Sequence, residues 1–262
     1  MERNVKTSSR IRKVGKQIQQ AKKLDQISKA SGDQRKIPKA DLAYEILKEN
    51  IITLKFSPGM RLEEKKLINE LDLGRTPIRE GLRMLISEGL VVNYGSSASY
   101  VKDLTLKSAK DLLSLLYHLG QLIFNLADIE KDYGGLIRNL WLVHKQMEEA
   151  ISQGELSEYA RSNAEFHRKL VTISNNEYLQ AFVDQLYCEE TRLSFVLSLV
   201  RLSENSLSDY YGTLQKQHGE LIELLGKKEF GKMNELYRTH LALGRRRLNL
   251  FFAEKMDNDW LE

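Results

Sequence analysis

The sequence has one cysteine, three prolines and no long hydrophobic run. A single cysteine, Cys188, excludes a framework of disulfides within the chain. The charged N-terminal segment contains no apolar stretch of the length of a signal peptide or a membrane-spanning helix, so we expect a soluble, cytoplasmic protein with no membrane partner. Three prolines in 262 residues, among abundant Leu, Lys, Glu and Ile, favour a mostly helical fold with few strands.

Positive charge is distributed unevenly along the chain. The net charge is +4, yet residues 1–40 carry twelve lysines and arginines against three acidic residues. A basic arm on an acidic body is common in nucleic-acid-binding proteins, although basic tails with no partner are about as frequent. The basic extension, residues 1–37, is compatible with a disordered tail or with a marginal amphipathic helix that Gly15 interrupts.

The segment 38–103 has the element order of a small DNA-binding domain. An apolar stripe over residues 42–51 predicts a first helix, and the stretch EEKKLINELDLG predicts a second helix that closes near Gly74. A third helix follows and stops at Gly89. The alternating residues 90–104 then predict a small β-hairpin. This order is typical of a winged helix-turn-helix.

The third helix begins within the stretch LGRTPIREGLRML. We expect Thr76 to be its N-cap and Pro77 to occupy the first helical position, where a missing N–H costs nothing. The apolar residues of the stretch then face the core, and Arg75 and Arg79 gather at the N-terminal end of the helix. An arginine there can hold guanine O6 and N7 with two hydrogen bonds, so both are candidate base-reading residues.

Other residues nearby are candidates for holding the DNA backbone. Lys65, Thr76 and the N–H groups at the start of the helix could bind phosphates, which fixes register without reading sequence. Arg83, one turn further along, is expected to contact backbone or an acidic neighbour. The alternative is that the basic residues form a solvated face on which Arg79 pairs with Glu80; the flanking elements favour the DNA-reading interpretation.

These motifs resemble those of the GntR superfamily of bacterial transcription regulators. In that family a PG.RL turn, a second helix and an SRTPVREAL start to the recognition helix recur in this order, and here they read PGMRL, with Arg61, and GRTPIREGL. The resemblance implies binding to a double-stranded DNA operator, with Arg61 among the contacts. Gly74 replaces the usual serine, and Gly81 replaces the usual alanine, which should loosen the helix by about 1 kcal/mol. The wing reads GSSASY, so Ser96 and Ser97 could offer only neutral hydrogen bonds to phosphate.

Beyond Leu104 only helical periodicity is visible. The expected helices lie near residues 107–129, 132–153, 155–174, 176–202, 207–227 and 229–254. We therefore expect residues 106–254 to form an all-α antiparallel bundle. The predicted fold class is mostly α: an N-terminal winged helix-turn-helix with a small hairpin wing, followed by this bundle.

Three histidines, His167, His218 and His240, fall inside these helices. Neutral imidazoles that converge from separate helices can bind a divalent metal, but their spacing in sequence does not show that they converge. The surrounding residues resemble the FadR-like branch of the superfamily, whose C-terminal FCD domain carries a D..FH motif and two further histidines. The resemblance implies a zinc or nickel site, with Asn163 in place of the usual aspartate. An amide oxygen is a weaker, uncharged donor, and Glu165 points too far round the helix to substitute.

The same resemblance bears on the effector. The first helix of such domains commonly carries an arginine and a glutamate that face the cavity, and here those places fall around Gly120 and Phe124. The pocket is therefore expected to be more apolar and its effector less acidic than the small carboxylates such an arginine holds. For each candidate lining residue, a core or surface role is favoured over a pocket role. The candidates are Tyr117, Tyr187, Arg192 and Tyr237.

The favoured interpretation is a ligand-responsive transcription regulator, more often a repressor, that binds a pseudo-palindromic operator as a homodimer. A small molecule in the helical domain would act by changing the spacing of the two reading heads. Two alternatives stay open. The helical domain could only dimerise, with neither metal nor effector, or the histidines could serve a metal-dependent hydrolase. No general base is evident beside the histidines, so we do not expect an enzyme.

Overall fold

The computed structural model describes residues 38–94, 98–199 and 204–257 of the chain. The predictions for the basic extension, residues 1–37, and for Ser96 and Ser97 lie outside the described residues. The chain divides into two compact units. Among the described residues, the first contains those of 38–51 and 56–102, and the second contains those of 52–55 and 103–257.

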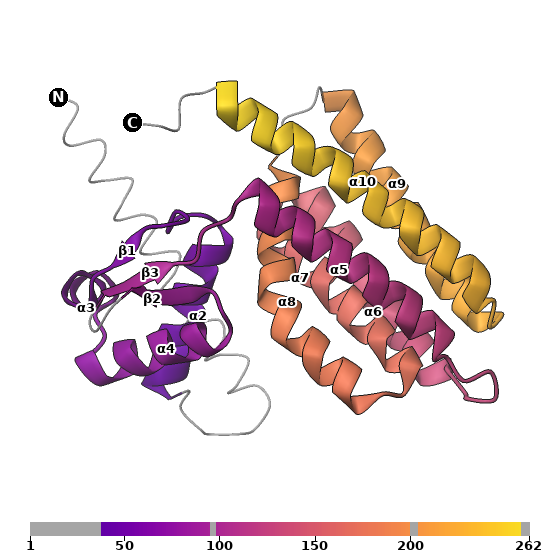
Figure 1. Ribbon diagram of the computed structural model, residues 1–262, viewed down its shortest axis with the longest axis horizontal. Coiled ribbons are helices and arrows are strands. Elements are labelled where there is room, and N and C mark those ends of the chain that lie inside the picture. Colours follow the sequence, from indigo (N-terminus) through magenta and orange to yellow (C-terminus); the bar gives the residue numbers. More distant parts are fainter. Residues whose placement is uncertain (1–37, 95–97, 200–203, 258–262) are drawn as a thin grey trace. The chain divides into compact units, whose positions relative to one another are not determined.

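The first unit is a winged helix-turn-helix (Figure 1). Its elements are α2 (Lys39–Ile52), β1 (Arg61–Leu62), α3 (Glu64–Leu71), α4 (Arg75–Ser87), β2 (Val91–Tyr94) and β3 (Ala98–Val101). In the apolar stripe expected in the first helix, Leu47 and Ile51 are fully buried and the other two residues are half-buried. Leu67 of α3 and Leu85 of α4 are also buried. Each helix therefore buries one face and leaves the other in solvent.

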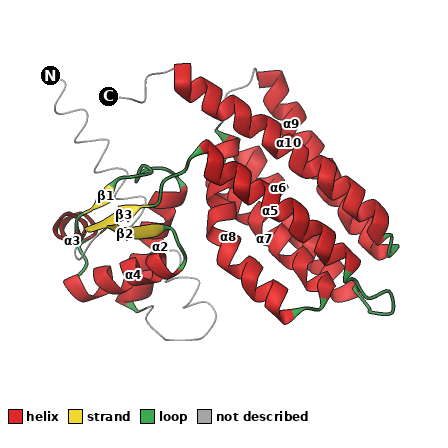
Figure 2. Ribbon diagram, in the orientation of Figure 1, coloured by secondary structure: helices red, strands yellow, loops and turns green. Residues whose placement is uncertain are grey.

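The sheet has three antiparallel strands in the order β1-β3-β2 (Figure 2). The predicted hairpin is present as β2 and β3, with Val91 opposite Val101. The sequence did not predict β1, because a two-residue strand shows no alternation. Arg61 of β1 pairs with Tyr100 of β3, which joins the turn before α3 to the wing.

Two predicted helix ends in this unit are wrong. The predicted N-cap of α4, Thr76, is instead the second residue of the helix, and Gly74 occupies the cap position with no side-chain hydrogen bond. Pro77 still lies in the first turn, where its ring is tolerated. Helix α3 ends at Leu71 and not near Gly74, because Asp72 adopts a left-handed conformation with φ of 51°. The predicted stop at Gly89 is confirmed, with φ of +73°.

Gly81 has a different role from the one expected of it. A Cβ at this position would lie 2.9 Å from the backbone nitrogen of Tyr44 and 3.2 Å from the carbonyl carbon of Ala43. The glycine therefore lets α4 approach the backbone of α2 more closely than any other residue would allow. The expectation that alanine would strengthen the helix considered propensity alone and is corrected by this contact.

The second unit is an all-α bundle, as predicted. Its elements are α5 (Leu106–Asn125), α6 (Gly134–Gln153), α7 (Leu156–Leu170), the 3₁₀ turn η1 (Val171–Ser174), α8 (Glu177–Ser198), α9 (Glu204–Gly226) and α10 (Phe230–Asp257). Helix α7 packs against α6 and α8, and α10 packs against α5 and α9 (Figure 1). Within the described residues, none of the helices combines the length and the apolar character needed to cross a membrane.

Local sequence explains where these helices begin and end. Thr105 and Ser108 form a reciprocal capping box at the start of α5, and the Asn176 side chain caps α8. Gly154 ends α6 with φ of +70°. Helix α5 stops at Asn125, short of the predicted residue 129.

We expect Gly81→Ala to destabilise the first unit by about 1–3 kcal/mol, because the added methyl group must push α2 and α4 apart. Hydrogen exchange measured on peptides from α2 and α4 of the full chain will show faster exchange. Gly212→Ala is the matched control, since Gly212 lies within α9 with no atom within 4 Å of an added Cβ. That control should slow exchange in α9. Unchanged or slower exchange around Gly81→Ala would contradict the steric explanation.

Candidate DNA-reading helix and candidate metal centre

Helix α4 presents a basic face to solvent. Its buried residues lie on one side, including Ile78 and Leu82, while the side chains of Arg75, Arg79 and Arg83 are 69%, 48% and 73% exposed. A helix seated on its own domain in this way can offer its outer side to a groove. The arginines are spaced so that they share that outer side.

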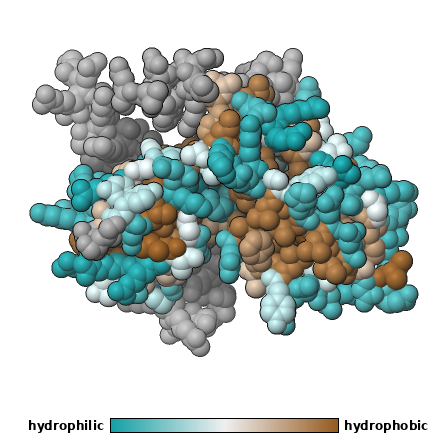
Figure 3. Space-filling model, in the orientation of Figure 1, coloured by the Kyte–Doolittle hydropathy of each residue, from teal (hydrophilic) through white to brown (hydrophobic). Residues whose placement is uncertain are grey.

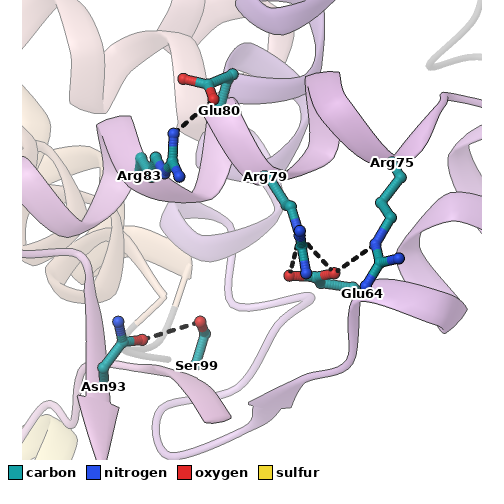
Figure 4. A network of polar contacts seen from close by, with 7 residues as sticks. All are labelled: Glu64, Arg75, Arg79, Glu80, Arg83, Asn93 and Ser99. Carbon is teal, nitrogen blue, oxygen red and sulfur yellow. Dashed lines mark hydrogen bonds and ion pairs between the residues drawn. The ribbon is translucent and has the colours of Figure 1, made fainter. Parts of the chain in front are cut away.

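Glu64 of α3 lies between two of these arginines (Figure 4). Its carboxylate accepts hydrogen bonds from Arg79 Nε at 2.9 and 3.0 Å, and Arg75 Nε lies 3.6 Å away. Arg79 is therefore paired across the turn and not with Glu80. Arg83 pairs with Glu80 at 2.7 Å, which matches the expected acidic neighbour. Exposed ion pairs contribute at most about 1 kcal/mol, so a stronger partner can displace Glu64.

The other candidate DNA contacts of the first unit are also accessible. Arg61, Lys65 and Thr76 are exposed on β1, α3 and α4. In the wing, Ser99 Oγ donates to Asn93 Oδ1 at 2.9 Å, which ties β2 to β3 (Figure 4). The roles of these side chains in binding stay predictions.

The three helical histidines converge. His167 of α7, His218 of α9 and His240 of α10 are buried, and one ring nitrogen from each lies within 4.8 Å of the others. Their ring centroids are 4.6–5.5 Å apart. Distances of this size let three imidazoles face one ion. They result from the packing of three helices that are far apart in sequence.

Burial keeps these imidazoles neutral. It lowers the pKa of His167 and of His218 well below the usual range, with His240 adding to the effect on both, and it lowers the pKa of His240 to about 4. A neutral imidazole is the form that binds a metal. At neutral pH the three rings are therefore ready to act as ligands.

The polar atoms of the cluster fit a metal ion. Both nitrogens of His218, and Nδ1 of His167, are buried without a hydrogen-bond partner among the described residues. His240 Nδ1 lies 3.1 Å from Gln217 Oε1. An Nδ1–H that donates to this acceptor leaves His240 Nε2 free to bind, which is the usual arrangement around metal-binding histidines.

A cavity of about 60 Å³ adjoins the cluster, with His167 and His240 in its wall. This volume has room for an ion and a few water molecules, and is below that of a typical drug-sized pocket. Asn163 also lines it, as its position one turn before His167 predicts. Glu165 is held by Arg168 and Lys169 at 2.7 and 3.0 Å, in keeping with its expected exclusion from the site.

Glu190 of α8 is a further buried residue at this cavity, and the sequence analysis missed it. Burial raises the pKa of Glu190 to about 8. No motif marks this residue, since it follows another glutamate on a helix and only its position shows that it points inward. Glu190 therefore joins the histidines as a candidate functional residue.

The four candidate effector-pocket residues are separated. Tyr237 lies against Gly120, where an added Cβ would be 2.4 Å from its ring, and it lines a second small cavity with His167 and Glu190. Tyr117 lines an open groove between α5 and α10. Tyr187 and Arg192 line neither cavity nor this groove. The effector-pocket assignment stays a prediction.

Comparisons with known proteins match both units. Residues 39–101 match the model of the bacterial regulatory proteins of the gntR family, and residues 130–243 match the FCD domain. The chain is 28% identical over 189 residues to the uncharacterized HTH-type transcriptional regulator YdhC of Bacillus subtilis, covering 71% of this chain and 80% of the relative.

Two further proteins are similar over most of their length. The HTH-type transcriptional repressor GlaR of Escherichia coli is 25% identical over 205 residues, covering 76% of this chain and 90% of the relative. The solved structure of E. coli McbR/YncC has a TM-score of 0.64 at 17% identity, covering 84% of this chain and all of that one. The last comparison supports the fold alone.

We expect the purified chain to bind Zn²⁺ or Ni²⁺ stoichiometrically, and His167→Ala or His240→Ala to lose that binding, since each variant removes a ligand. Metal analysis after loading and desalting measures it. His118→Ala is the control, because His118 is exposed and lies in the α5–α10 groove. A wild-type chain that retains neither metal under either loading condition would refute the site.

Proposed function

The chain belongs to the GntR family of bacterial regulatory proteins, in the FadR-like subgroup with a C-terminal FCD domain, and we propose that it is a metal-assisted, ligand-responsive repressor. It is a DNA-binding transcription regulator, and its family is not one of enzymes. The hydrolase alternative is therefore dropped. Two features of one chain support the finer proposal: the exposed arginine face of α4 in the first unit and the buried histidine cluster in the second.

DNA reading would use α4 in the major groove. Arg75 and Arg79 are at the N-terminal end of the helix, the end that reaches base edges in helix-turn-helix proteins. Lys65, Arg61 and Thr76 would contact phosphates and fix the register. Binding to the chromosome would put the protein in the cytoplasm.

A homodimer would provide the affinity for operator DNA that one subunit lacks. One helix covers only a short half-site, so two subunits bound about one helical turn of DNA apart read a pseudo-palindrome together. The helical unit has surface suited to self-association: hydrophobic residues gather on the face that Figure 3 displays. Leu122, Trp141 and Leu142 are among the exposed large apolar side chains of the helical unit, whichever face they lie on.

The effector response would begin at the histidine cluster. A metal held by His167, His218, His240 and Asn163 would give a small molecule a Lewis-acidic anchor beside the cavity. Position 120 is a glycine, so it has no guanidinium to hold a carboxylate, and a tyrosine ring lies against it instead. A ligand there changes DNA binding only if it prefers one of two dimer conformations.

Repression is the proposed outcome because the relative GlaR is named as a repressor. The alternative that the helical unit only dimerises rests on the neutral Asn163. Stoichiometric metal that disappears in the histidine variants would exclude a metal-free unit of that kind.

We expect Arg79→Ala to weaken binding to the operator far more than binding to random DNA, because a lost bidentate contact to guanine costs about 1–3 kcal/mol at one position. Lys65→Ala should weaken both to a similar extent, since phosphate contacts are independent of sequence. The operator is first obtained by selecting random DNA with the full chain. Affinities are then measured at one fixed salt concentration, and parallel losses for both variants would contradict the base-reading role.

We expect Glu64→Gln to strengthen DNA binding, because Arg79 and Arg75 no longer have to leave a carboxylate. The release is worth up to about 1 kcal/mol, or about fivefold in affinity. Glu70→Gln is the matched control: it makes the same change of charge on an exposed residue of α3. An equal gain in both variants would reduce the effect to net charge, and weaker binding by Glu64→Gln would mean that Glu64 holds Arg79 in its reading position.

A further inference from the structure

The candidate metal centre lacks an acidic group at the position where the family pattern has one. Three neutral imidazoles and the Asn163 amide would surround a divalent ion with no negative charge. A buried charge without compensation is strongly disfavoured in a protein interior. A carboxylate from another lining residue would compensate that charge and strengthen the binding of the ion.

Glu190 has the position for this role. It is 6% exposed, and its Oε2 has no hydrogen-bond partner among the described residues. It lines both small cavities that His167 lines, and one of these is also lined by Asn163 and His240. Helix α8 thus brings a carboxyl group to the wall of the cavity that adjoins the cluster.

The surroundings of Glu190 offer no protein cation to neutralise it. Neither cavity has a lysine or an arginine among its described lining residues, and the other groups there are apolar side chains, hydroxyls, an amide and imidazoles. A buried carboxyl oxygen with no hydrogen-bond partner is costly, so a purely structural glutamate would be a poor choice here. A cation bound in the cavity would remove that cost.

We propose that Glu190 supplies the negative charge of the metal site from α8, in place of the carboxylate that position 163 lacks. Among the described residues, the ligand atoms within 4.8 Å of one another are those of the three histidines alone, so the Glu190 carboxylate acts through an ion-bound water, for which the 60 Å³ cavity has room. This assignment rests on the proposed metal-assisted function. It makes the histidine cluster a four-helix site with a net charge that suits a divalent ion.

The test compares metal affinity in three variants of the full chain with that of the wild type. Glu190→Gln, which keeps the shape of the side chain, should weaken Zn²⁺ binding by about 10- to 100-fold in competition with a chromophoric chelator. Asn163→Asp in the same chain should restore most of that loss by returning a carboxylate one turn from His167. Asp184→Asn is the control, because it removes an exposed acid from the same helix and should leave the affinity unchanged.

The absorption spectrum of the Co²⁺-loaded chain gives a second readout that is independent of affinity. Glu190→Gln should change the ligand-field bands, and circular dichroism without metal should show that the variant is folded. A wild-type affinity and spectrum in Glu190→Gln would overturn the role of Glu190 while leaving the histidine site intact. A wild-type chain that binds none of Zn²⁺, Co²⁺ and Ni²⁺ would overturn the metal site together with this assignment.

Discussion

The helical unit depends on packing α7, α9 and α10 closely enough to bring three imidazole nitrogens within 4.8 Å of one another. That packing buries the rings, and burial keeps them neutral, so the same constraint that assembles the cluster also sets its protonation. Buried nitrogens without partners are costly in an empty core and useful in a ligand set. Glu190 of α8 adds a buried carboxyl oxygen without a hydrogen-bond partner among the described residues. A bound cation would satisfy this oxygen and the imidazole nitrogens together.

The reading unit is built on the opposite principle. The arginines of α4 are exposed, and Glu64 holds Arg79 through an ion pair that contributes little in water. Such a pair orders the Arg79 side chain but binds it weakly, so a phosphate or a guanine can replace the carboxylate. The rigid part is the buried side of α4, where Ile78 and Leu85 fix the direction of the helix.

Two glycines show why helix propensity alone misjudges a packed position. Gly81 admits the backbone of α2, and Gly120 admits the ring of Tyr237 beside the histidines. In each case atoms of another helix fill the space that a side chain at the glycine would occupy. The first determines how tightly the reading helix is seated. The second lets an aromatic ring occupy space that any side chain at position 120 would fill, and this ring lines one of the small cavities.

The order of elements, the arginine face of α4 and the helical character of the second unit could all be predicted from sequence, because they depend on periodicity and on residues within a few positions. Local rules were less accurate at helix ends: Asp72 closes α3 early and Gly74, not Thr76, caps α4. The short strand β1 has no pattern of its own. The convergence of His167, His218 and His240, the Glu64–Arg79 pair and the inward position of Glu190 were decided only by the tertiary structure, because each brings together side chains from elements whose packing angle and rotation no local pattern encodes.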